Sequence, residues 1–77
     1  MIKIEKNNIG NEIKSYIVRS GKKMTEIVDI INRDKDEKDK TSLQNLSNKL
    51  RRGSLRYDEI LEIAEACGYE IAWMRKE

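Results

Sequence analysis

Glycine spacing is the feature that most constrains the fold of this 77-residue chain. Gly21, Gly53 and Gly68 each follow a stretch in which apolar residues recur every three or four positions, the period of an amphipathic helix. Glycine often follows the last turn of a helix, because it adopts the left-handed backbone conformation without steric cost. The spacing therefore predicts an all-α protein made of short helices.

Four helices are expected, with a shared core over about residues 9–68. Thr25 is expected to cap the second helix, and Thr41 with Gln44 has the spacing of a capping box that would open the third, over residues 41–52. The apolar residues that predict the four buried faces are, in chain order, Ile9, Ile13, Tyr16 and Ile17; Ile27, Val28, Ile30 and Ile31; Leu43, Leu46 and Leu50; and Ile60, Leu61, Ile63, Ala64 and Cys67.

Residues at both ends of the chain alternate between apolar and polar, which is the period of a β-strand. Residues 2–5 predict a short first strand, and the alternation of Tyr69, Ile71 and Trp73 predicts a tail strand over about 69–75. Because a lone strand leaves its backbone groups unpaired, the tail is expected to pair with residues 2–5 or with the tail of a second subunit around a two-fold axis. The whole chain, 1–77, is interpreted as a single domain.

Composition argues against several classes of function. The chain has no histidine and a single cysteine, Cys67, so zinc sites built from Cys and His, triads with a histidine base and internal disulfides are excluded. It also lacks a glycine-rich phosphate loop and any long apolar segment. We expect no enzymatic activity, no cofactor, no metal and no membrane partner, and a cytoplasmic location.

Charge is unevenly distributed along the chain. Residues 41–57 carry four cations and no acid, whereas residues 58–77 carry six acids and two cations. A basic helix face is often only a solvated surface. The absence of any carboxylate from 41–57 nevertheless favours a function for that segment, since 39% of the residues are charged and acids nearly equal bases. Residues 34–40, by contrast, mix both signs without an apolar anchor, which favours a mobile loop. The alternative is a helical extension, since opposite charges lie four residues apart in this segment.

The polar face of the expected third helix has the side chains that read DNA. Asparagine and glutamine pair with adenine and arginine pairs with guanine, while lysine and serine hold phosphates. Arg56, just beyond Gly53, is placed to reach the DNA backbone. The predicted DNA-binding residues are Thr41, Ser42, Gln44, Asn45, Asn48, Lys49, Arg51, Arg52 and Arg56.

Three stretches of the chain, Met24 to Ile31, Leu46 to Gly53 and Ile60 to Gly68, resemble the Cro/CI (XRE-type) helix-turn-helix family over about residues 9–68. The string from Gln44 to Leu50 and the ending from Ile63 to Gly68 resemble it most clearly. The resemblance implies a lambda-repressor-like four-helix domain from a phage or mobile element, in which a recognition helix enters the major groove. It implies a transcriptional regulator, most simply a repressor, that binds an inverted-repeat operator as a homodimer. The chain departs from the family at two places. The connection at 34–40 is longer than the family's turn of three or four residues, and the start of the second helix has only Glu26 near the position of the family's phosphate-contacting glutamine. The alternative is a protein-interaction module on the same fold, such as a phage-type inhibitor or adaptor.

Overall fold

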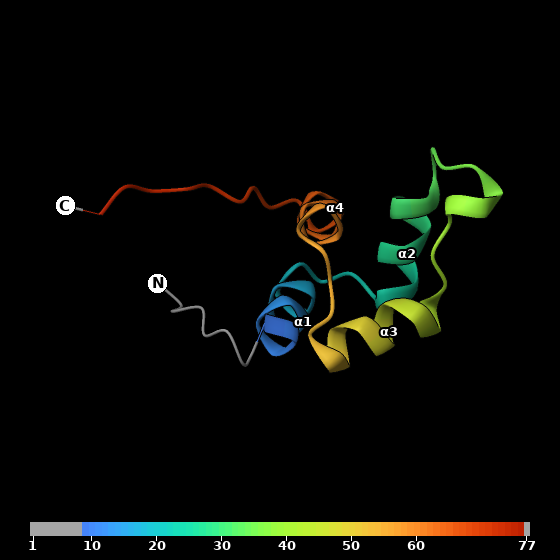
Figure 1. Cartoon of the computed structure of the whole chain (residues 1–77), viewed down its shortest axis with the longest axis horizontal. Helices are drawn as coiled ribbons and strands as arrows, with labels where there is room; N and C mark the ends of the chain where they lie inside the picture. The colour runs from blue at the N-terminus through green and yellow to red at the C-terminus, as the bar shows by residue number, and fades with distance from the viewer. Residues whose placement is uncertain (1–8, 77) are drawn as a thin grey trace.

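The computed structural model describes residues 9–76, and every regular element in that part of the chain is helical (Figure 1). The all-α prediction is confirmed at this level. The elements are α1 (Ile9–Arg19), α2 (Met24–Asn32), a short 3-10 helix η2 (Glu37–Asp39), α3 (Leu43–Arg52) and α4 (Tyr57–Cys67). The predicted first strand, residues 2–5, lies outside the described residues.

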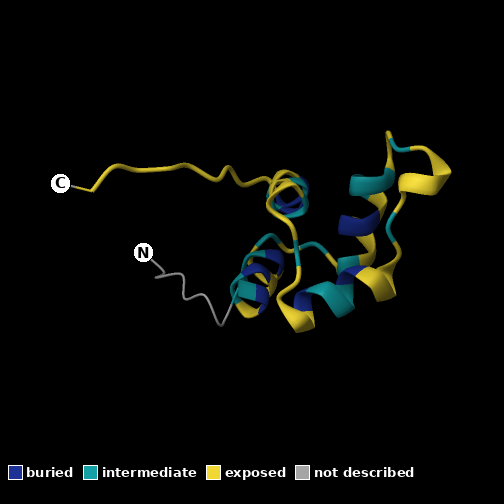
Figure 2. Cartoon of the chain, viewed as in Figure 1, coloured by how far each residue is buried: buried dark blue, intermediate teal, exposed yellow. Residues whose placement is uncertain are grey.

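One apolar core lies between the four α-helices, and the buried faces of all four turn inward (Figure 2). Ile27 on α2 and Leu50 on α3 are the most completely buried large side chains, at 0% and 2% exposure. The predicted face of α3 is wrong at Leu43, which is 42% exposed, and that of α4 at Leu61, which is 39% exposed, while Ala66 of α4 is buried instead. The core residues are Ile13, Ile17, Ile27, Val28, Leu46, Leu50, Ile63, Ala66 and Cys67.

The glycines end their helices as predicted. Gly53 and Gly68 have φ angles of 68° and 85°, in the left-handed region, and their backbone N–H groups donate to carbonyls of the last turns of α3 and α4. Tyr69 N–H then donates to Ala64 O at 2.8 Å, which closes the end of α4. Each turn reverses the chain abruptly, so that short helices can pack on one another.

The N-cap of α2 differs from the predicted one by two residues and that of α3 by one. α2 begins at Met24 rather than after Thr25, because the Lys23 N–H donates to the Glu26 carboxylate at 3.2 Å and completes the first turn without a side-chain cap. α3 begins at Leu43, and its cap is Ser42, whose Oγ accepts the Asn45 N–H at 3.1 Å. The predicted Thr41 capping box is therefore wrong, and the helix is Leu43–Arg52 rather than 41–52.

The backbones of α1 and α3 are in tight contact at Gly10. This glycine is buried, and a Cβ atom added to it would overlap the Leu50 carbonyl oxygen and lie 2.9 Å from the carbonyl carbon. Only a residue without a side chain lets the two backbones come this close. Gly10 thus determines how deeply the C-terminal half of α3 sits on α1.

The C-terminal tail, residues 69–76, has no regular secondary structure and runs away from the helices (Figure 1). The strand predicted at 69–75 is therefore not seen. A strand is defined by ladder hydrogen bonds to a neighbouring strand, and the tail forms none with the described residues. Two of its side chains make contacts instead: Tyr69 packs edge-on against Tyr16, and Trp73 Nε1 donates to Tyr57 OH of α4 at 3.0 Å. Apart from that contact of Trp73, both Trp73 and Met74 are open, at 87% and 86% exposure.

Candidate nucleic-acid interface

α3 buries one side in the core and leaves the opposite side open (Figure 2). Leu46 and Leu50 are buried, and no residue of α3 is acidic. The nine predicted residues lie together along this helix and at its two ends. Those that are exposed are Ser42, Gln44, Asn45, Arg51, Arg52 and Arg56, and those that are partly buried are Thr41, Asn48 and Lys49.

Asn48 and Arg51 are coupled on the open side of α3. The Arg51 guanidinium donates to Asn48 Oδ1 at 2.8 Å. A bidentate contact between asparagine and adenine uses both the oxygen and the nitrogen of the amide. Asn48 can therefore read a base in that way only after Arg51 turns away from it.

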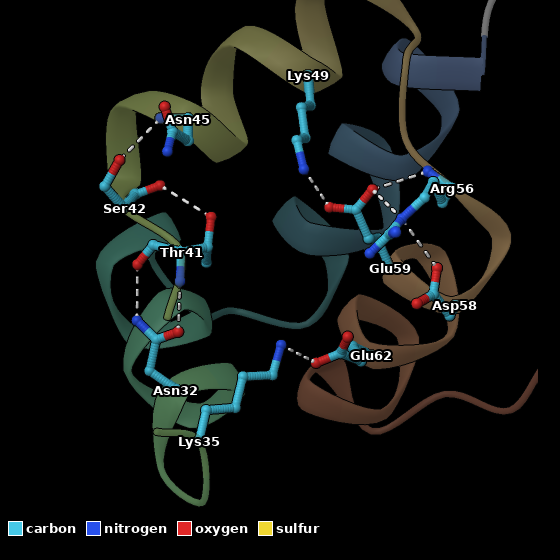
Figure 3. Close-up of polar contacts among 10 residues, drawn as sticks. All are labelled: Asn32, Lys35, Thr41, Ser42, Asn45, Lys49, Arg56, Asp58, Glu59 and Glu62. Carbon is cyan, nitrogen blue, oxygen red and sulfur yellow. Dashed lines mark hydrogen bonds and ion pairs between the residues drawn. The ribbon is translucent and has the colours of Figure 1, made fainter. Parts of the chain in front are cut away.

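The start of α3 is held by Asn32, the last residue of α2 (Figure 3). Its Nδ2 donates to Thr41 O at 2.8 Å, and its Oδ1 accepts the Thr41 N–H at 2.9 Å. These two bonds occupy the backbone polar groups of Thr41, which explains why the cap falls on Ser42. Sequence reasoning gave Asn32 no functional part, because a side chain that bonds nine residues ahead leaves no periodic signal.

The connection between α2 and α3 is more ordered than the predicted mobile loop. It contains η2, and Lys35 forms an ion pair with Glu62 of α4 at 2.6 Å (Figure 3). Together with the Asn32 bonds, this contact places the connection against the body of the protein. The expected lack of regular structure at 34–40 is therefore wrong at Glu37–Asp39, which forms η2.

Lys49 points toward α4 rather than along the open side of α3 (Figure 3). Its Nζ lies 2.5 Å from Glu59 Oε2, and the Glu59 side chain is only 17% exposed. The other oxygen of Glu59 accepts the Arg56 N–H at 2.9 Å and lies 3.6 Å from Arg56 Nε, which is also 3.5 Å from Asp58. Two of the predicted phosphate contacts are thus already paired with carboxylates of α4.

The environment of Glu59 changes its acidity. Burial by itself raises the pKa of the carboxyl group, but the hydrogen bonds from Lys49 and the Arg56 backbone, with the charges of both residues, outweigh burial and hold the pKa below its ordinary 4.5. Because the folded-state pKa is the lower one, the pairing stabilises the fold above about pH 4.5 and is lost as the pH falls through the folded value.

We expect the free energy of unfolding to fall with acidification more steeply in the native protein than in a Glu59→Gln variant. The amide keeps the hydrogen-bonding shape but cannot be protonated in this range, so the contribution of Glu59 is missing from its pH dependence. Urea denaturation at pH 6 and at pH 3 measures both proteins. Parallel losses of stability in the two would contradict the assignment.

No known protein family, curated protein or solved structure matched the chain in these comparisons. Within residues 9–76, no helix is long and apolar enough to cross a membrane. The same residues contain no group of three His, Cys, Asp or Glu side chains positioned to hold a metal ion.

Proposed function

We propose that the protein binds double-stranded DNA in a sequence-specific manner by placing α3 in the major groove, and that it acts as a transcriptional regulator of the repressor type. The observation that carries this proposal is the surface of α3. The helix is anchored by Leu46 and Leu50, and its open side offers amide and guanidinium groups without a carboxylate. Such groups match the donor and acceptor patterns of base edges.

The relation between α2 and α3 supports the same proposal. A recognition helix must be held rigidly, because base contacts require donor and acceptor atoms within a few tenths of an ångström of their positions. The Asn32 bonds and the Gly10 contact restrain the two ends of α3. The resemblance to the helix-turn-helix family agrees with this arrangement, although the connection is longer than the family's turn.

The test is a selection of bound duplexes from a random DNA library by the purified protein, followed by titration of the winning duplex against salt concentration. Enrichment of one sequence supports the proposal. Absence of enrichment, together with weak and strongly salt-dependent binding, would contradict it and favour the protein-interaction module, with the basic side of α3 facing an acidic partner.

A homodimer formed through the tail is part of this proposal. A groove of about 380 Å³ lies between α1, α4 and the start of the tail, and its lining is mostly apolar. Glu12 lines it, and its Oε1 is buried without a hydrogen-bond partner among the described residues. We propose that the tail of a second copy enters this groove, with Trp73 exchanging its contact with Tyr57 of its own chain for the groove. Trp73 and Met74 are exposed and apolar, and the Arg75 and Lys76 that follow complement the carboxylate.

We expect sedimentation equilibrium to show a dimer, and a Trp73→Ala variant to weaken it by roughly thirtyfold or more, since a buried tryptophan is commonly a dominant interface residue worth about 2 kcal/mol. Val18→Ala is the control, because Val18 is also apolar and exposed, at 77%, but does not line the groove. A native protein that stays monomeric at the highest concentration would contradict the dimer. If dimeric, it should select an inverted repeat with half-sites about 34 Å apart.

A further inference from the structure

We propose that Glu59 is an internal counter-ion that holds Lys49 away from DNA phosphates and so limits the sequence-independent part of DNA binding. This inference rests on the proposed DNA-binding function. It reverses the simplest interpretation of Lys49, which is that a lysine beside the polar face of α3 contacts phosphate.

The geometry around Glu59 is that of an occupied anion site. One oxygen lies 2.5 Å from Lys49 Nζ on α3, and the other accepts the Arg56 N–H at 2.9 Å and lies near the Arg56 guanidinium (Figure 3). A lysine ammonium, an arginine and the first turn of a helix are the groups that proteins use to bind phosphate. Here a carboxylate of the same chain takes that place.

Glu59 is held in place by more than its contact with Lys49, whose own side chain is 40% exposed. Glu59 sits at the third position of α4, where its bond to the Arg56 backbone also completes the start of the helix, and its side chain is 17% exposed. Breaking the contact with Lys49 would leave a mostly buried carboxylate without its closest cation. A DNA phosphate must therefore interact with Lys49 more favourably than Glu59 does in order to displace it.

The expected consequence concerns specificity. Each lysine that neutralises a phosphate releases counter-ions and strengthens binding to any duplex, whatever its sequence. A lysine kept by Glu59 adds nothing to this general affinity. The contacts made by Arg52 and the amides then account for a larger share of the total, and the ratio of specific to random binding rises.

The experiment compares five proteins: the native chain, Glu59→Gln, Glu65→Gln, Lys49→Met and the double variant Glu59→Gln with Lys49→Met. Glutamine retains the capping bond of the third helical position. Glu65 is the matched control, because it lies exposed on the same helix and forms no ion pair among the described residues, so its replacement changes the net charge equally. The readout is the slope of log affinity against log salt concentration for a random duplex.

We expect Glu59→Gln to bind random duplexes roughly threefold to tenfold more tightly at low salt, with a slope steeper by about one, since one more cation reaches phosphate. Glu65→Gln should keep the native slope, and the double variant should return to it. Lys49→Met should also keep the native slope, and this test holds even if Glu59→Gln were to fold poorly.

Two results would overturn the inference. One is a Glu59→Gln slope equal to that of the native protein and of Glu65→Gln, and the other is a Lys49→Met slope lower by about one, which would place Lys49 on phosphate in the native complex. Either result beside an enriched DNA sequence leaves the proposed function intact. If none of the five proteins binds duplex DNA, the proposed function fails together with the inference.

Discussion

A Gly10→Ala variant is expected to lose about 3 kcal/mol or more of its free energy of unfolding, the upper range for overpacking a protein interior. The added methyl group meets the Leu50 carbonyl of α3, which is backbone and cannot rotate aside as a side chain would. α1 and α3 must then move apart and open the core around Leu50. For a 77-residue protein, such a loss is a large part of the total stability.

Packing and helix propensity predict opposite changes in the free energy of unfolding of Gly10→Ala. Alanine favours a helix by about 1 kcal/mol over glycine, so propensity alone predicts that Gly10→Ala stabilises the protein. Thermal and urea denaturation of the variant measure which effect is larger. Asn11→Ala is the control, because Asn11 is exposed in the same turn of α1 and should change little. A variant as stable as the native protein would mean that the two helices do not approach each other this closely.

An Arg52→Ala variant is expected to lose roughly 5- to 150-fold of its preference for the selected duplex over random DNA, the equivalent of about 1 to 3 kcal/mol for one base contact. Arg52 is exposed at the end of α3 and forms no ion pair among the residues described, so its guanidinium is available to a guanine. The affinity for random duplex should fall much less. Competition titrations with both duplexes measure the ratio.

Lys38→Ala is the matched control for Arg52. It also removes one exposed cation, but it lies on η2, outside the helix proposed to contact bases. We expect its ratio of specific to random binding to equal the native one. Equal losses on both duplexes for Arg52→Ala would show that Arg52 holds phosphate and does not read sequence.

The helical part of the fold could be predicted from local patterns. The ends of three helices are marked by Gly21, Gly53 and Gly68. Glycine is a reliable signal there because the left-handed conformation depends on the residue at that one position. The first residue of a helix is harder to predict. Thr41 and Ser42 are both residue types that commonly cap helices. The choice depends on the two bonds from Asn32, which the linear sequence does not reveal.

The candidate site was predicted in composition but not in orientation. A helical wheel places Lys49 beside the polar side of α3. It does not show that the Lys49 side chain turns toward Glu59, because that depends on where the next helix lies. The tail could not be predicted for the same reason. The alternation of Tyr69, Ile71 and Trp73 is compatible with a strand, but a strand forms only where a neighbouring strand is present to pair with it. Contacts between elements decide both cases.

The paired bonds of Asn32 and Thr41 also make the connection between them a natural site for inserted sequence. They join the two ends of the segment, so its length can change without moving the first residue of α3. The loop-closure entropy of a longer connection grows slowly, at about 0.6 kcal/mol for each doubling. A peptide tag or a small binding module placed in the exposed part near Lys38 would be carried beside α3 and leave its position unchanged.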